Sequence, residues 1–174
     1  MRFILMNIFT KIKMELFLLC LLLSNNSALA NSDYATKAHQ IYQFAQYIEW
    51  RGENDTLTFC VVGENPVSNQ LSQVIANKKI NGHPLEFKQI TGNHLGNCDI
   101  AFISDSKRGE LGQVLHSTRH LLTVSDIPDF AEHGGMIEFT KVEGRLRFVI
   151  NRNAAVRAGI KISSQLLKLA HKIL

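Results

Sequence analysis

The sequence predicts an α/β fold: a single domain with a mostly parallel sheet flanked by helices and a C-terminal antiparallel hairpin. Two nearly continuous apolar runs, 57–63 and 98–104, are typical of strands covered on both faces. Segments with apolar residues at helical spacing alternate with strands, the order expected of a parallel sheet. Near the C-terminus, apolar and polar residues alternate over 137–140 and 145–151, which predicts a half-buried strand pair.

The first thirty residues differ from the rest and predict a cleavable signal peptide, residues 1–30. Basic residues precede an apolar run over 16–23, which is too short to span a bilayer. The triplet Ala-Leu-Ala at 28–30 supplies the small residues of a cleavage site, so we expect cleavage after Ala30. Either Met1 or Met14 could be the start, because the residues between them add little to the signal.

Export would leave the mature chain, residues 31–174, as one domain in an oxidising compartment. The full chain is 45% hydrophobic, which suits a domain with its own core. Removal of the signal deletes three basic residues and one acidic residue and lowers the formal charge from +4 to +2. No cluster of Lys or Arg remains, so the sequence does not support nucleic-acid binding.

Two cysteines, Cys60 and Cys98, follow the predicted signal. An oxidising compartment favours a disulfide between them, with two buried free thiols as the alternative. If the bond forms, loop-closure entropy limits its stabilisation to about 4 kcal/mol. Their spacing is not the Cys-x-x-Cys of a redox catalyst.

The mature chain is expected to open with a loose polar stretch over 31–34. A helix follows from residue 35, with Gly52 as its stop. Its core face is predicted from apolar residues that recur three and four apart: Ala38, Ile41, Phe44, Ala45 and Ile48.

The first buried strand leads to the pair Asn65-Pro66, which is typical of a helix start. A turn-rich connection over 78–84 then precedes a less buried strand over 85–90. After the second buried strand, residues 107–118 predict a helix and residues 120–125 the next strand.

The C-terminal third is expected to hold the hairpin and two short helices. Gly144 can adopt the positive φ that the hairpin connection needs. Asn153 is expected to cap a turn of helix over 154–158, which Gly159 ends. Ser163 or Ser164 is expected to cap a last helix with its apolar residues on one side: Leu166, Leu167, Ala170, Ile173 and Leu174.

The carboxyl ends of parallel strands are the usual position of ligand sites in such a sheet. Ser104 and Ser125 stand there, each followed by an aspartate. Their hydroxyls could bind a ligand or cap the following turn, and both roles stay open at this point.

No other pattern indicates catalysis. The sequence has no P-loop, no Gly-x-Ser-x-Gly and no Gly-x-Gly-x-x-Gly. His116 and His120 are four apart, but no Cys or carboxylate completes a metal-ligand set. We therefore predict no catalytic residue, no metal and no cofactor.

Two arginines, Arg145 and Arg147, are predicted on one side of the hairpin. They could pair with Glu138 across the strands, meet an anionic partner, or form a solvated strand face.

With these segments placed, the chain resembles the YfiR family, also described by the domain name DUF4154. Four stretches carry the match. The first three are KAHQIYQFAQYIEW at 37–50, FCVVGENP at 59–66 and NGHPL at 81–85. The longest, 122–170, includes Ser-Asp-Ile-Pro-x-Phe, Gly-Gly-Met-Ile, Arg-x-Arg-Phe-x-Ile-Asn and Ile-Ser-Ser-Gln-Leu-Leu-Lys-Leu-Ala. Together they span nearly the whole mature chain in order.

The resemblance implies a periplasmic protein, not an enzyme, that binds and inhibits the periplasmic sensory part of an inner-membrane diguanylate cyclase. Cyclic-di-GMP signalling and biofilm formation would fall as a result. It also implies an outer-membrane lipoprotein that sequesters the inhibitor, and a homodimer. Cys60 and Cys98 match one cysteine pair of the family. A second pair is absent, with Ala131 and Glu138 in its neighbourhood, which puts redox regulation through that bond in doubt.

The partner-binding surface is expected at the turn over 126–135 and its flanks. The residues expected to form it are Asp126, Phe130, Gly134, Gly135, Arg145 and Arg147. Phe130 is either an interface anchor or a core plug. The alternative function is a small-ligand-binding module that reports to a membrane sensor such as a histidine kinase, which a sizeable pocket at Ser104 and Ser125 would favour.

Overall fold

The computed structural model describes residues 25–50, 55–116, 118 and 120–174. The charged start and apolar run of the predicted signal peptide lie outside these residues, as does the predicted helix stop Gly52. Within the described part, no helix is both long and apolar enough to cross a membrane. Residues 35–174 form one compact unit, and the sheet lies in it.

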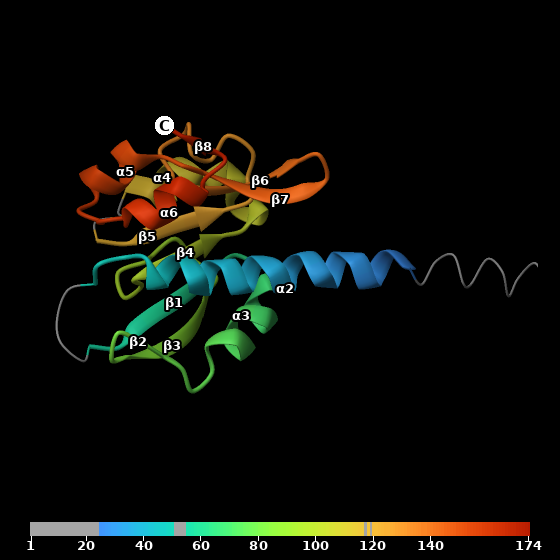
Figure 1. Cartoon of the computed structure of the whole chain (residues 1–174). Coiled ribbons are helices and arrows are strands. Elements are labelled where there is room, and N and C mark those ends of the chain that lie inside the picture. Colours follow the sequence, from blue (N-terminus) through green and yellow to red (C-terminus); the bar gives the residue numbers. More distant parts are fainter. Residues whose placement is uncertain (1–24, 51–54, 117, 119) are drawn as a thin grey trace, which may run out of the picture. The chain divides into compact units, whose positions relative to one another are not determined.

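An eight-stranded sheet is the centre of this unit (Figure 1). In spatial order the strands are β2 (Lys79–Ile80), β3 (His83–Ile90), β1 (Leu57–Val62), β4 (Ile100–Ile103), β5 (Leu122–Ser125), β6 (Ile137–Val142), β7 (Arg145–Ile150) and β8 (Lys172–Ile173). The strands from β3 to β6 run parallel, whereas β2 and β7 are antiparallel to their hairpin partners β3 and β6. The predicted α/β fold with a C-terminal hairpin is confirmed.

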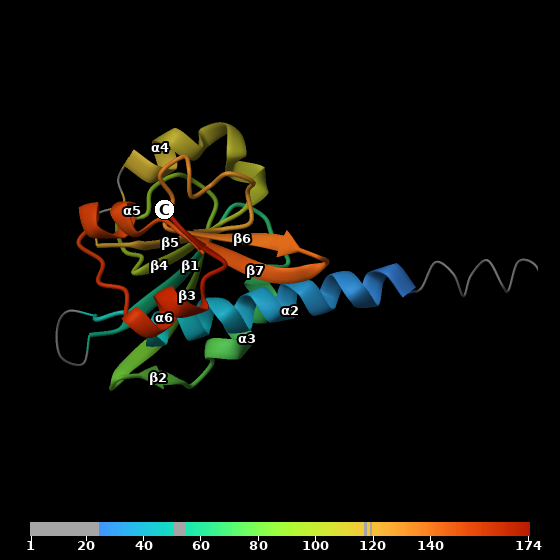
Figure 2. The same ribbon diagram turned by 45° about the horizontal axis from the view of Figure 1, so that its top comes forward.

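Helices cover both faces of the sheet (Figure 2). One face carries α3 (Val67–Ile75), α6 (Ser164–Leu169) and the part of α2 (Asn25–Gln46) that belongs to this unit. The other carries the 3-10 helix η1 (Asp105–Glu110), α4 (Leu111–His116) and α5 (Arg152–Arg157). Two core layers result, which explains why the central strands are apolar on both sides.

The buried residues follow the sequence pattern closely. All six residues of β1 are buried. The residues predicted for the core face of the first helix, from Ala38 to Ile48, are at most 3% exposed, although α2 ends at Gln46, before Ile48 and before the predicted stop. Phe44 on this face stacks on Phe139 and meets Phe148 edge to face, at ring-centroid distances of 5.6 and 4.9 Å. The hairpin is thereby fixed to α2.

Two boundaries of the N-terminal half differ from the prediction. Residues 31–34 are helical rather than loose, because α2 begins at Asn25 and continues through them. Cleavage after Ala30 stays a prediction. Residues Asn81 and Gly82, predicted as part of a connection, form a tight hairpin turn between β2 and β3 with φ of 50° and 91°. The Asn-Gly pair was the available signal for this turn.

Two boundaries of the C-terminal half also differ. Asn151, not Asn153, caps α5, because its Oδ1 accepts the N–H of Ala154 at 2.8 Å. The last helix is capped by Ser163 as predicted but ends at Leu169. The chain then turns and adds β8 beside β7. The predicted apolar side of one long helix is therefore wrong, and Ile173 is 49% exposed on an edge strand.

Candidate functional site

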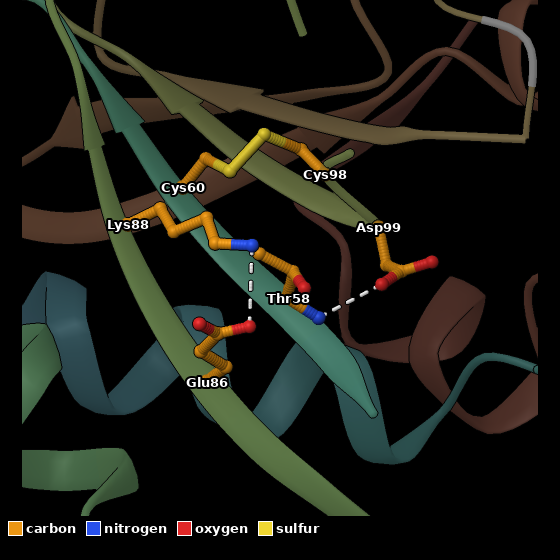
Figure 3. Close-up of a disulfide and its surroundings, with 6 residues drawn as sticks. All are labelled: Thr58, Cys60, Glu86, Lys88, Cys98 and Asp99. Carbon is orange, nitrogen blue, oxygen red and sulfur yellow. Dashed lines mark hydrogen bonds and ion pairs between the residues drawn. A yellow bond between two sulfur atoms is a disulfide. The ribbon is translucent and has the colours of Figure 1, made fainter. Parts of the chain in front are cut away.

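The predicted disulfide is present and lies in the parallel half of the sheet (Figure 3). It joins Cys60, in the middle of β1, to Cys98 just before β4, with a Cα–Cα distance of 5.9 Å over a sequence separation of 38. Cys60 is fully buried. The free-thiol alternative is therefore excluded in this structure, and the bond fixes two adjacent strands.

Beside the disulfide, Asp99 fastens the start of β4 to β1. Its Oδ2 accepts the N–H of Thr58 at 2.8 Å, and its own N–H donates to the Thr58 carbonyl at 2.9 Å. Burial raises the pKa of Asp99 above its ordinary value of 3.8, although the Thr58 hydrogen bond opposes this. Figure 3 shows Asp99 directly before β4, and on β3 the ion pair of Lys88 and Glu86, whose N–O distance is 3.2 Å. The contacts of Asp99 are structural.

The hydroxyl groups of the two serines at the strand ends both form hydrogen bonds to the backbone. Ser104 Oγ donates to the carbonyl of Glu64 at 2.8 Å, and Ser125 Oγ donates to that of Ile103 at 2.6 Å. Ser125 Oγ also accepts the N–H of Ile127, as a turn cap does. Both serines are at most 2% exposed. Ligand binding at these positions stays a prediction, and the geometry favours the capping role.

The loop 126–136, which we call the β5–β6 loop, is built around Phe130. Its ring is fully buried in the core between the sheet and α4. The ring lies directly on Gly135, so that a Cβ on Gly135 would fall far inside van der Waals contact with it. Gly134 has a φ of +100°, which favours glycine. Phe130 is a core plug, and the glycines make its position possible.

Polar contacts from α2 and from β6 hold the same loop. Asp126 Oδ2 forms an ion pair of 2.5 Å with Lys37 of α2, although Asp126 Oδ1 is buried without a hydrogen-bond partner. Glu138 accepts the N–H of Asp129 and that of Ala131, at 3.3 and 3.0 Å. The proposed pairing of Glu138 with the hairpin arginines is therefore wrong.

Sequence analysis missed these loop contacts because they join distant positions. Lys37 and Asp126 are 89 residues apart. Asn151 reaches back 20 residues, and its Nδ2 donates to the Ala131 carbonyl at 2.7 Å. No local pattern marks such pairs. The only available signal was the polar type of Asn151 at the end of an apolar strand.

The hairpin arginines are the predicted residues that remain on the surface. Arg145 and Arg147 are exposed on β7, opposite Val142 and Thr140 of β6. They line a hollow of about 310 Å³ together with Leu169 and His171. Of the predicted partner-binding residues, Phe130 and Gly135 are therefore buried, Asp126 and Gly134 are partly buried, and Arg145 and Arg147 are exposed.

The described residues contain no group of three or more His, Cys, Asp or Glu placed to hold a metal ion.

Residues 34–171 match the YfiR/HmsC-like family, DUF4154. The chain belongs to this family. The resemblance noted in the sequence is thereby confirmed, and membership supports a periplasmic regulator of diguanylate cyclase signalling in general. Comparison with curated proteins finds no match.

Two solved structures share the fold of this YfiR/HmsC-like chain. One is the ABC domain in complex with L-Trp from Streptococcus pneumoniae, at 11% identity, and the other a conserved domain protein from Vibrio cholerae O1 biovar El Tor, at 12%. Each has a TM-score of 0.54 and matches 81% of this chain. The chain spans 60% of the length of these structures, and the likeness shows the fold alone.

Proposed function

We propose that this chain binds the periplasmic sensory part of an inner-membrane diguanylate cyclase and inhibits it, which lowers cyclic-di-GMP and biofilm formation. The observation that carries the proposal is the family match over residues 34–171, which covers nearly the whole α/β unit. The Cys60–Cys98 disulfide supports an oxidising compartment such as the periplasm. Export by a cleavable signal peptide is part of the same proposal.

The physical mechanism needs a rigid binder rather than a catalyst. A domain that prefers one state of a receptor shifts the receptor toward that state by the difference between its two affinities. A hundredfold preference corresponds to about 2.7 kcal/mol. The parallel strands joined by the disulfide and the hairpin packed on Phe44 provide such a rigid scaffold. An outer-membrane lipoprotein that competes for the chain would release the cyclase, and a homodimer is compatible with the proposal.

The test combines a cellular and a purified measurement. Deleting the gene in a strain that has the cognate cyclase should raise cyclic-di-GMP, and the purified chain should bind the periplasmic domain of that cyclase. Unchanged cyclic-di-GMP together with no binding would refute the proposal. Binding to the sensor domain of a histidine kinase instead, dependent on a small molecule, would favour the ligand-module alternative.

A further inference from the structure

The edge of the sheet beyond the hairpin is only partly covered. β8 pairs with β7 in parallel, but only Lys172 and Ile173 take part, opposite Val149 and Ile150. The remaining contacts are the N–H of His171 to the Phe148 carbonyl and that of Leu174 to the Ile150 carbonyl, at 2.9 and 2.8 Å. The turn end of the hairpin extends beyond β8 (Figures 1 and 2).

These contacts show which backbone groups stay open. Hydrogen-bonding direction alternates along a strand, so Leu146 points its N–H and C=O to the same side as Phe148 and Ile150, away from β6. Among the described residues no strand pairs with Leu146 on that side. We call the segment 145–147 the open β7 edge. Unpaired strand edges are templates for pairing with another chain.

The side chains of the open β7 edge are cationic. Arg145 and Arg147 project to one side of the strand and are exposed, and neither has an ion-pair partner in the described part of the chain. His171 lines the same hollow. A segment that adds to this edge would therefore gain from carboxylates opposite the two guanidinium groups.

A surface of mixed apolar and polar residues adjoins the cationic one. Leu169, at the end of α6, is 61% exposed and lines both the hollow beside the arginines and a second hollow of about 360 Å³. The apolar part of the second hollow is lined by Phe44, Leu146, Phe148, Leu166 and Leu169, and its polar part by Gln40, Gln43, Gln46, Tyr47 and Arg147. A strand at the open β7 edge could place alternate apolar side chains toward this surface.

We infer that the open β7 edge binds an extended segment of the partner in which acidic and apolar residues alternate, by adding a strand to the sheet. The inference rests on the proposed function, because the partner is the periplasmic part of the cyclase. A second copy of the chain is a poor occupant of this edge. Antiparallel pairing of two copies through Leu146 would set Arg145 of each opposite Arg147 of the other, and like charges directly opposite are destabilising.

The first experiment measures binding of the purified chain to the cyclase periplasmic domain. Arg145→Glu/Arg147→Glu should weaken binding about tenfold or more. The matched control, Lys78→Glu/Lys79→Glu, makes the same charge change at exposed residues next to and in β2, at the opposite edge of the sheet, and should weaken binding less than about threefold. Leu146→Pro removes the open N–H and should also weaken binding about tenfold, whereas Leu146→Ala keeps it and should retain most of the affinity.

The second experiment measures hydrogen exchange of the Leu146 amide in the unmodified protein, which needs no variant to fold. Its exchange should slow at least about tenfold in the complex, since strand addition protects the outward amide. The same amide is followed with a synthetic Glu-Val-Glu-Val-Glu peptide as probe, and with Lys-Val-Lys-Val-Lys as its control.

The outcomes separate the two proposals. Binding of the cyclase domain with an unprotected Leu146 amide and no effect of arginine reversal refutes the edge inference and leaves the inhibitor proposal. No binding of the cyclase domain, with Leu146 protected by the Glu-Val peptide alone, refutes the inhibitor proposal and supports the edge. If neither the cyclase domain nor the Glu-Val peptide protects the Leu146 amide, the edge inference is refuted. Protection upon self-association would also refute it, because the occupant would then be a second copy.

Discussion

The β5–β6 loop and the open β7 edge were predicted to form one partner surface, and in the structure their predicted binding residues differ in burial. In the loop, Phe130 is fully buried and the Asp126 and Glu138 carboxylates contact groups within the domain, whereas Pro128, Asp129, Glu132 and His133 are exposed. The edge turns outward: Arg145 and Arg147 are exposed and Leu146 has open backbone groups.

The difference shows how to interpret distinctive residue types. An aromatic residue beside a Gly-Gly pair stands out in the loop, but Phe130 packs directly on Gly135, where the ring needs a position without a Cβ. The arginines belong to an ordinary alternating strand, yet the fold gives them no partner among the described residues. The edge inference therefore rests on exposed cationic side chains beside an unpaired strand segment, and not on unusual residue types.

The largest effect on stability is expected from adding a methyl group at Gly135, where the Phe130 ring packs. Gly135→Ala should lower the free energy of unfolding by about 4 kcal/mol, because the new methyl group meets a ring that is itself held in the core. Chemical denaturation measures it. Gly112→Ala is the matched control, since nothing lies within 4 Å of a Cβ there, and it should cost nothing. If Gly135→Ala is also neutral, the loop is not built around the ring.

A smaller loss is expected from the ion pair that ties the loop to α2. Asp126→Ala should cost about 2 kcal/mol, because it removes a carboxylate from Lys37, whose side chain is only 11% exposed. The control Asp105→Ala breaks the pair of Asp105 and Arg108, which is mostly exposed, and should cost less than about 0.5 kcal/mol. Equal losses for the two variants in thermal unfolding would contradict the assigned difference in burial.

A third prediction extends the contrast between buried and exposed groups to pH. The folded state raises the pKa of Asp99, so it holds the proton more tightly than the unfolded state, and this group's contribution to stability falls as pH rises from about 3.8 through the folded pKa. Asp99→Asn should remove that fall while it keeps an acceptor for Thr58. The measurement is the melting temperature between pH 3 and 7.

Glu110 provides the control of opposite sign. Hydrogen bonds from Asn93 and Lys107 lower the pKa of this exposed carboxyl, so its contribution is lost as pH falls below its ordinary value of 4.5. Glu110→Gln should remove that loss. If both variants change the pH profile in the same direction, the environments of these two carboxyls are assigned wrongly.

The smallest effect on stability is expected at the open β7 edge. Arg145→Glu/Arg147→Glu should change the free energy of unfolding by less than about 0.5 kcal/mol, because both side chains are exposed and unpaired in the described part of the chain. Calorimetry of the double variant checks it. A loss of 2 kcal/mol or more would show that these arginines support the fold, and would remove them as a clean probe of binding.

The sequence predicts what depends on local pattern. The apolar run of β1, the Asn65-Pro66 start of α3 and the Ser163 cap of α6 all lie where expected, because each follows from adjacent residues. The disulfide follows from export and a cysteine count. The choice between Asn151 and Asn153 as a cap does not, because it depends on where β7 ends and on the distant Ala131 carbonyl.

The candidate site was less predictable than the fold for the same reason. β8 has only two residues, too few to show alternation, so its partial cover of β7 leaves no trace in the sequence. Whether Phe130 is a plug or an anchor is decided by packing between the loop and α4. Such contacts depend on the assembled sheet.

The most direct test of the central claim is the cyclic-di-GMP level of a deletion strain that carries each variant at equal periplasmic amounts. We predict that Lys78→Glu/Lys79→Glu restores the low level, as the unmodified chain does, whereas Arg145→Glu/Arg147→Glu leaves it as high as in the deletion. Full restoration by the arginine variant would contradict the claim that the chain controls the cyclase through the open β7 edge.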